Sequence, residues 1–157
     1  MYQPEFVHDE RTMKWNLRFM RKAEDAAMDS KDPSTKVGAL IVSENGNILS
    51  TGYNGFPRKV RDLDERLNDR TIKYPLTVHA ELNALSNCLT EGISTKGSIL
   101  ICTHLPCATC CGVLLQAQVE KWVIKKPTEE FKKRWGEEYK FTMMMIKDAG
   151  INPIIVE

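Results

Sequence analysis

The chain has 157 residues, of which 42% are apolar and 27% charged, and its formal net charge is +1. This length suits one domain with a full hydrophobic core, so we expect a single domain over 1–157. The near-neutral charge lacks the basic excess of nucleic-acid-binding proteins, and no apolar run approaches the roughly 18 residues of a membrane span. We therefore expect neither nucleic acid nor a membrane as a partner, although a small anionic substrate needs only a few local cations.

The cellular compartment is indicated by the N-terminus and the cysteines. The stretch MYQPEFVHDERTMKW contains no apolar signal core, and the five cysteines, three of them in CATCC, form an odd number. An odd set suits a disulfide framework poorly and fits a reducing compartment better. We expect a protein of the cytoplasm, or of the host cytoplasm for a viral chain, with buried thiols and a metal site.

The first elements in chain order are a helix and a hairpin. Apolar side chains recur on one side of 12–28, including Trp15 and Phe19, which predicts an amphipathic helix. The segments 37–42 and 47–53 are predicted strands, joined by a turn at Asn-Gly, since this pair tolerates positive φ. The GYNGFPRK stretch that follows is rich in glycine and proline and is expected to be a loop.

The segment 58–73 alternates charges of both signs and admits two interpretations. It is either a solvated short helix or loop, or an anion-handling insertion, because its basic residues outnumber its acidic ones.

The rest of the chain alternates helices and strands. In the helix at 79–89, Leu82, Leu85 and Leu89 are expected to share one face. An alternating pattern of this kind predicts an α/β three-layer α/β/α sandwich around a mixed five-stranded sheet whose later strands run parallel. The further predicted helices are 107–118, 131–135 and 139–149, and the further strands are 98–103, 122–124 and 151–156.

The LPCATC stretch is a candidate metal site. Cys107 and Cys110 stand three apart at a helix start behind Pro106, so they point the same way. The helix dipole there lowers the pKa of a thiol and favours the thiolate that binds zinc, although the pair could equally be small buried hydrophobes. His79 opens another predicted helix. It would complete three protein ligands, the number typical of a catalytic zinc that also binds water.

Glu81 stands two residues after His79, so the two do not share a helix face. It could shuttle a proton between water and substrate, or it could be a helix-start glutamate that satisfies the dipole. The cysteine pair favours the catalytic interpretation, because His-x-Glu followed by Pro-Cys-x-x-Cys is the signature of zinc nucleobase deaminases.

The chain resembles the deoxycytidylate deaminases. DPSTKVGALIV, GYNGFPR, KYPLTVHAELNA and THLPCATC occur in the order and approximate spacing of that family and cover most of 32–111. The resemblance implies a cytidine-deaminase-like fold with zinc held by His79, Cys107 and Cys110. It implies hydrolysis of dCMP to dUMP and ammonia, with Glu81 as the general acid–base, and hence a supply of dUMP for thymidylate synthesis.

The resemblance also implies contacts to the substrate. Asn54 matches the family position that contacts the sugar, whereas the alternative for an asparagine in this loop is a turn former. The candidate contacts are Ala80, Thr103 and Leu105 for the pyrimidine edge and Thr35 and Lys36 for the phosphate. For Lys36, a solvated strand flank is an equal alternative.

Members of this family are often hexamers that dCTP activates and dTTP inhibits at a site separate from the zinc. The resemblance implies effector contacts at Asn54, Gly55 and Arg58, with Mg²⁺ accompanying the triphosphate, since a glycine lets a ligand approach the backbone. Many relatives have glycine where this chain has Lys59, and the sequence of the 58–73 loop differs from that of the relatives. The presence and sign of regulation therefore stay open.

Other interpretations also stay open. A tRNA adenosine deaminase shares the metal motif but predicts a basic surface, and a free-cytidine deaminase usually has cysteine in place of His79. Deamination of dCTP as well as dCMP is compatible with the sequence. A structural zinc module would need a fourth protein ligand, for which Cys102, His104 and Cys111 are the candidates. Cys111 is a poor one, because adjacent helical residues point about 100° apart. We interpret Cys88 as a core thiol.

Overall fold

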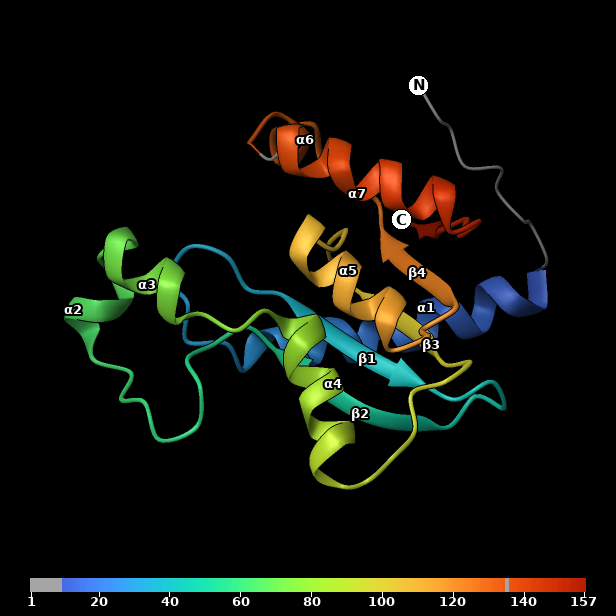
Figure 1. The fold of residues 1–157 in the computed structure, drawn as a ribbon, viewed down its shortest axis with the longest axis horizontal. Helices are drawn as coiled ribbons and strands as arrows, with labels where there is room; N and C mark the ends of the chain where they lie inside the picture. Colours follow the sequence, from blue (N-terminus) through green and yellow to red (C-terminus); the bar gives the residue numbers. More distant parts are fainter. Residues whose placement is uncertain (1–9, 135) are drawn as a thin grey trace.

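A five-stranded sheet forms the centre of the computed structural model, which describes residues 10–134 and 136–157 (Figure 1). The strands are β1 Gly38–Val42, β2 Ile48–Tyr53, β3 Ile99–Cys102, β4 Lys121–Lys125 and β5 Ile154–Val156. Their spatial order is β2-β1-β3-β4-β5. β1 is antiparallel to β2 and β3, whereas β3, β4 and β5 are parallel. The mixed sheet with parallel later strands is confirmed.

Helices cover both faces of this sheet. They are α1 Glu10–Met28, α2 Asp64–Leu67, α3 Arg70–Leu76, α4 Ala80–Thr90, α5 Ala108–Gln116, α6 Glu129–Arg134 and α7 Gly136–Asp148. Side chains alternate along β1: Leu40 and Val42 pack with Phe19 of α1, whereas Ala39 and Ile41 pack on the side of α4, α5 and α7. The three-layer arrangement is therefore as predicted. No helix in the described part of the chain has the length and apolar character to cross a membrane.

Two glycines let helices lie directly against the sheet. A Cβ at Gly38 would lie 1.8 Å from the Ala23 carbonyl oxygen of α1. A Cβ at Gly52 would lie 2.4 Å from the carbonyl oxygen of Ala80 and from the backbone nitrogen of Ala84, both in α4. Larger residues would push these helices away from the sheet. Gly52 in particular sets where the first turn of α4 lies.

The predicted helical faces are correct in part. Trp15 is 48% exposed, so it does not join Phe19 in the core; its ring lies 5.9 Å from that of Phe19. On α4, Leu85 and Cys88 are buried, but Leu89 is 79% exposed. The three leucines do lie on one side of α4, but the buried face is offset toward Cys88, which points about 100° away from Leu89.

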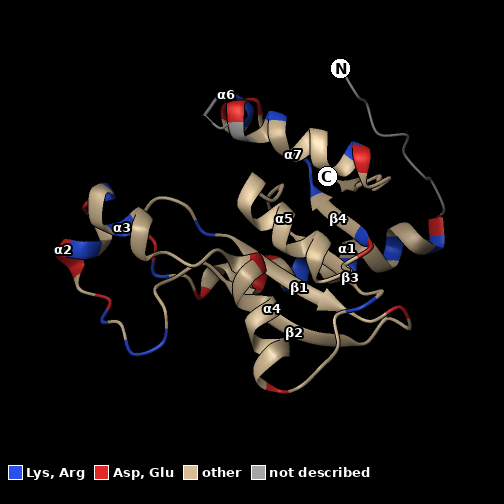
Figure 2. Cartoon of the chain, in the orientation of Figure 1, with Lys and Arg blue, Asp and Glu red and all other residues tan. Residues whose placement is uncertain are grey.

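The charged segment after β2 forms α2 and α3 at one end of the molecule (Figure 2). No residue of α2 is buried, which fits the solvated interpretation. Asp69 caps α3 by accepting a hydrogen bond from the Thr71 N–H. Lys73 of α3 departs from that interpretation, because it is buried at 4% exposure.

Candidate functional site

Two helix starts meet beside β1 and β3. His79 is the N-cap residue of α4 and Cys107 that of α5, and both have extended backbone conformations. The backbone before His79 is held in place because Val78 exchanges two hydrogen bonds with Gly55. α5 is held at its start by Thr142 of α7, whose buried hydroxyl donates to the Pro106 carbonyl at 2.9 Å. These tethers bring the predicted metal ligands to one place.

The three predicted ligands converge on one point. The Sγ atoms of Cys107 and Cys110 lie 3.4 and 3.3 Å from Nδ1 of His79, and the three ligand atoms lie within 4.8 Å of one another. Zinc binds sulfur at about 2.3 Å and imidazole nitrogen at about 2.0 Å, and a tetrahedral arrangement spans such separations. One imidazole with two thiols is also a donor set that zinc prefers. The residues therefore fit a zinc ion.

The two thiols do not hold their protons equally. A hydrogen bond from the Cys110 thiol, with smaller contributions from His79 and the Cys110 backbone N–H, lowers the pKa of Cys107 to about 4. The same hydrogen bond, together with burial, raises the pKa of Cys110. A metal ion takes thiolates as ligands, so binding would release the Cys110 proton. All five cysteines lie in the described residues and are free thiols.

The candidates for a fourth protein ligand lie elsewhere. Among the described residues, only His79, Cys107 and Cys110 form a cluster of this kind. Cys102 interacts with the Glu81 carboxyl, and Nδ1 of His104 lies 3.2 Å from the Thr103 hydroxyl. Cys111 is fully buried in the core cluster. Three protein ligands are the arrangement of a catalytic zinc rather than of a structural one.

Glu81 lies in the first turn of α4 and borders the same cavity as His79 and Cys107. Glu81 is buried, with only 3% of its surface exposed. Burial, opposed by smaller effects of its own backbone and of His79, raises the pKa of Glu81 to about 7. A carboxyl with such a pKa can both accept and donate a proton near neutral pH, as acid–base catalysis requires.

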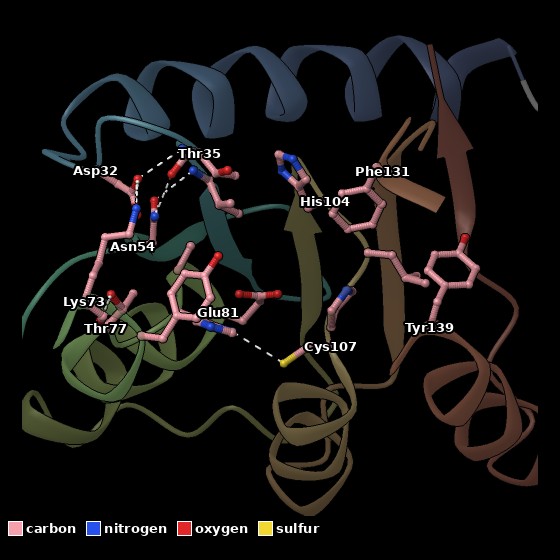
Figure 3. Close-up of a pocket in the computed structure, with 16 residues that line it drawn as sticks. Asp32, Thr35, Asn54, Lys73, Thr77, Glu81, His104, Cys107, Phe131 and Tyr139 are labelled. Carbon is pink, nitrogen blue, oxygen red and sulfur yellow. Dashed lines mark hydrogen bonds and ion pairs between the residues drawn. The ribbon is translucent and has the colours of Figure 1, made fainter. Parts of the chain in front are cut away.

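The metal centre opens into a cavity of about 310 Å³ with two different ends (Figure 3). This volume is at the lower limit of small-molecule sites. The side on which Asp32 and Lys73 lie is here called the polar end, and its residues are Asp32, Thr35, Asn54, Lys73 and Thr77. The opposite side is the aromatic end, formed by His104, Phe131 and Tyr139. There the Phe131 ring lies 5.0 Å from His104 and 6.5 Å from Tyr139.

Comparison with known proteins identifies the family of this site. The family model described as the cytidine and deoxycytidylate deaminase zinc-binding region matches residues 13–126. The chain belongs to this family. Its match includes both metal motifs and the whole polar end.

Individual relatives match most of the chain. A protein of Aliivibrio fischeri named as an uncharacterized deaminase in the luxG 3′ region is 39% identical over 138 residues, 88% of this chain and 90% of that protein. Mouse deoxycytidylate deaminase is 33% identical over 144 residues, 88% of this chain and 78% of its own. The crystal structure of dCMP deaminase from cyanophage S-TIM5 in complex with dCMP and dUMP has a TM-score of 0.72 at 27% identity. That match covers 95% of this chain and 100% of the phage chain.

Four of the six predicted substrate contacts line the deaminase-family cavity, and two do not. Ala80 and Leu105 border it near the metal centre, while Thr35 and Asn54 lie at the polar end. The Thr103 hydroxyl instead accepts a hydrogen bond from the Gly38 N–H at 3.1 Å. The exposed Lys36 is also outside the cavity lining, because its ammonium donates to the Ser30 carbonyl. Thr103 and Lys36 thus lie outside the cavity lining, and their contact with the substrate stays a prediction.

Asn54, at the sugar position of the family, is bonded to the protein on both sides of its amide. Its Oδ1 accepts from the Val37 N–H and its Nδ2 donates to the Thr35 carbonyl, both at 2.8 Å. These bonds join the segment before β1 to the end of β2. Within the described residues, Nδ2 of Asn54 donates only the bond to Thr35, and the sugar contact stays a prediction.

The three predicted effector contacts of the family do not gather in one place. Asn54 and Gly55 line a second cavity of about 110 Å³, but both backbone polar groups of Gly55 are already bonded to Val78. The Arg58 guanidinium lies outside that lining and donates to Asn87 at 3.0 Å. Lys59 adopts φ +71, in the left-handed region that favours glycine. At this position the chain keeps the conformation that suits the glycine of many relatives.

Sequence reasoning missed several cavity residues. Asp32 and Lys73 were not assigned a role, although both stand in the DPSTKVGALIV and KYPLTVHAELNA motifs, which was the signal available. Phe131 and Tyr139 were placed in helices without a function, because nothing in a charged helical segment indicates which side chain reaches a site formed by earlier parts of the chain.

Proposed function

We propose that this chain is a zinc-dependent dCMP deaminase, which converts dCMP and water to dUMP and ammonia. The observation that carries the proposal is the position of Glu81, a buried carboxyl beside three convergent metal ligands in a cavity at the lower limit of small-molecule sites. Relatives with this activity in their names, and the phage enzyme in complex with dCMP and dUMP, support the choice of dCMP as substrate.

The zinc site and Glu81 divide the chemistry between them. A zinc ion held by His79, Cys107 and Cys110 would supply Lewis-acid chemistry that makes water a nucleophile near neutral pH. Glu81 accepts a proton from water and donates it to N3, which makes C4 of the cytosine ring a better electrophile for the water oxygen. It then takes the second water proton from the new C4 hydroxyl and transfers it to the exocyclic amine, which leaves as ammonia while the C4 carbonyl forms.

The surroundings of Glu81 suit both halves of this cycle. Burial keeps the pKa of the carboxyl near neutrality, so the protonated and ionised forms have similar free energies. Leu105 and Pro106 add buried apolar walls beside the metal centre. Such walls exclude competing water and strengthen the electrostatic interactions of the carboxyl.

The substrate is tested by ammonia release from zinc-loaded protein offered dCMP, dCTP, deoxycytidine and a tRNA anticodon stem. We expect release from dCMP, with deoxycytidine and dCTP slower by about tenfold or more, the order of one lost or clashing polar contact. No release from dCMP, or release from the tRNA stem alone, would contradict the proposal.

We extend the proposal to regulation and assembly. dCTP would activate and dTTP inhibit, with Mg²⁺ accompanying the triphosphate, in a homo-oligomer expected to be a hexamer in the cytoplasm that supplies dUMP for thymidylate synthesis. The second cavity adjoins the first, because Asp32, Asn54 and Thr77 line both, so a ligand there would contact residues of the polar end; its volume of about 110 Å³ would hold only part of a triphosphate. Titration of dCTP and dTTP into the ammonia assay tests regulation, and a flat response to both rejects it. Sedimentation analysis gives the assembly.

A further inference from the structure

The polar end of the cavity contains a buried cation. Lys73, in α3, is 4% exposed and yet lines the cavity. Of the described residues in that lining, it is the only lysine or arginine. Burying an ammonium is unfavourable unless it is paired, so its position calls for a physical explanation.

Asp32 pairs with this buried ammonium and so explains part of its burial. Its Oδ1 atom lies 3.0 Å from Nζ of Lys73, and it also accepts from the backbone N–H groups of Ser34 and Thr35 at 2.8 and 3.1 Å. Burial raises the pKa of Asp32, but these two N–H groups and Lys73 outweigh that effect and hold the pKa below its ordinary value. The carboxylate therefore has three donors and does not depend on Lys73 alone.

Lys73 is less fully bonded than its partner. An ammonium has three N–H donors. Among the described residues its one short bond is to Asp32, since the contact to the Ser34 hydroxyl is long at 3.4 Å. A cavity-lining ammonium with capacity to spare, beside a carboxylate held by two other donors, is arranged to share its charge with a second anion.

The surroundings show where that anion would lie. Figure 3 draws Asn54 and Thr35 on the same side of Glu81 as Lys73, so the sugar position, the hydroxyl of Thr35 and the ammonium form one end of the site. The opposite end is aromatic. A phosphate monoester carries about −1.5 to −2 charges at neutral pH and forms charge-assisted hydrogen bonds with ammonium groups.

We propose that Lys73, held by Asp32, binds the 5′-phosphate of the substrate and thereby makes the site select nucleoside monophosphates over nucleosides. This inference rests on the proposed function for its substrate. In this account Lys73 replaces Lys36, whose ammonium points to the Ser30 carbonyl outside the cavity, as the phosphate contact. Asp32 limits the positive charge at this end and so keeps the affinity for phosphate moderate.

The test measures binding of the two product forms, dUMP and deoxyuridine, by calorimetry on the zinc-loaded full chain. These molecules differ only in the phosphate and are not turned over. In Lys73→Met we expect the dissociation constant of dUMP to rise about 10- to 100-fold, the loss expected for one charge-assisted hydrogen bond, while that of deoxyuridine changes less than about threefold. The proposal is overturned if both ligands weaken equally or if neither changes.

Lys36→Met is the matched comparison, because it removes the same charge at a position between two lining residues, Thr35 and Val37, that is itself outside the cavity lining. A change in the ratio of the two dissociation constants as large as that in Lys73→Met would overturn the proposal, since the effect would then be unspecific electrostatics. Ammonia release from dCMP by unaltered protein is scored separately. Its absence contradicts the deaminase activity, whereas the binding ratio alone decides the role of Lys73.

Asp32→Asn keeps the test decisive if Lys73→Met does not fold. The amide can still accept from the Ser34 and Thr35 N–H groups, but it no longer neutralises the ammonium. We expect dUMP to bind about threefold more tightly or better, with deoxyuridine unchanged. Unchanged or weaker binding of dUMP would overturn the proposal.

Discussion

The metal centre and the polar end of the cavity use their polar side chains in opposite ways. At the metal centre, the ligand atoms of His79, Cys107 and Cys110 converge within 4.8 Å, an arrangement that a shared cation stabilises. At the polar end, Asp32 and Asn54 are bonded to backbone groups of the segment before β1. The polar end therefore contributes to the fold as well as to the site.

Substitutions in the two regions should therefore have different effects on activity and stability. Changes at the metal centre should remove chemistry and leave the fold, because α4 and α5 are anchored by other contacts. Changes at the polar end should alter stability and binding together, because the same atoms serve both.

The largest effect is expected from removing a metal ligand. Cys110→Ala should weaken zinc binding by more than about 100-fold, because substituting even a residue that only hydrogen-bonds to a metal ligand lowers metal affinity by about 10- to 100-fold. Ammonia release should be lost with the metal. Elemental analysis of the dialysed protein gives the zinc content. Cys111→Ala is the matched control, a neighbouring buried thiol that should retain zinc. Equal zinc loss in both variants would show that the core, not the ligand, is affected.

An intermediate effect is expected at Asn54. Asn54→Ala leaves the Val37 N–H and the Thr35 carbonyl without their partner, which should lower the free energy of unfolding by about 1–3 kcal/mol and raise KM for dCMP. Urea unfolding and initial rates measure the two quantities. Asn87→Ala removes two exposed bonds, one to the Thr51 carbonyl and one from the Arg58 guanidinium, and it should cost less and leave KM unchanged. If Asn54→Ala raised KM but left the free energy of unfolding unchanged, Asn54 would contact the substrate without stabilising the fold.

The smallest effect is a pH dependence at Asp32. Because its pKa is lower in the folded protein, the ionised carboxylate stabilises the fold above the unfolded pKa of about 3.9. That contribution is lost as the pH falls through the folded value. The difference in unfolding free energy between the wild type and Asp32→Asn should therefore be largest at neutral pH and shrink in acid. A difference that grows in acid would mean that the pKa is raised instead.

The sequence was sufficient for the metal centre because its information is local. Cys107 and Cys110 are three residues apart, and His79 and Glu81 two apart, so each pair is placed by one helix start. The hairpin was predictable for the same reason, and Gly46 takes the expected positive φ at +86. Family resemblance joined these local signals into one site.

The polar and aromatic ends could not be predicted in this way, because they depend on distant segments. Lys73 follows a charged stretch and has the composition of a solvated residue; only the packing of α3 beside Asp32, 41 residues earlier, buries it. Lys36 was a candidate phosphate contact because of its place before β1, with a solvated strand flank as an equal alternative, and its side chain turns to the Ser30 carbonyl. Side-chain direction at a strand flank is set by neighbours that the sequence does not reveal.

The most direct test of the account is Glu81→Gln, in which zinc content and ammonia release from dCMP are measured on the same sample. Glutamine has the shape of glutamate but cannot carry the proton, so we predict full zinc occupancy with activity lower by about 100- to 10,000-fold. Unchanged ammonia release would contradict the role of Glu81 as the proton carrier. Loss of zinc would contradict the three-ligand site, because Glu81 would then be a ligand.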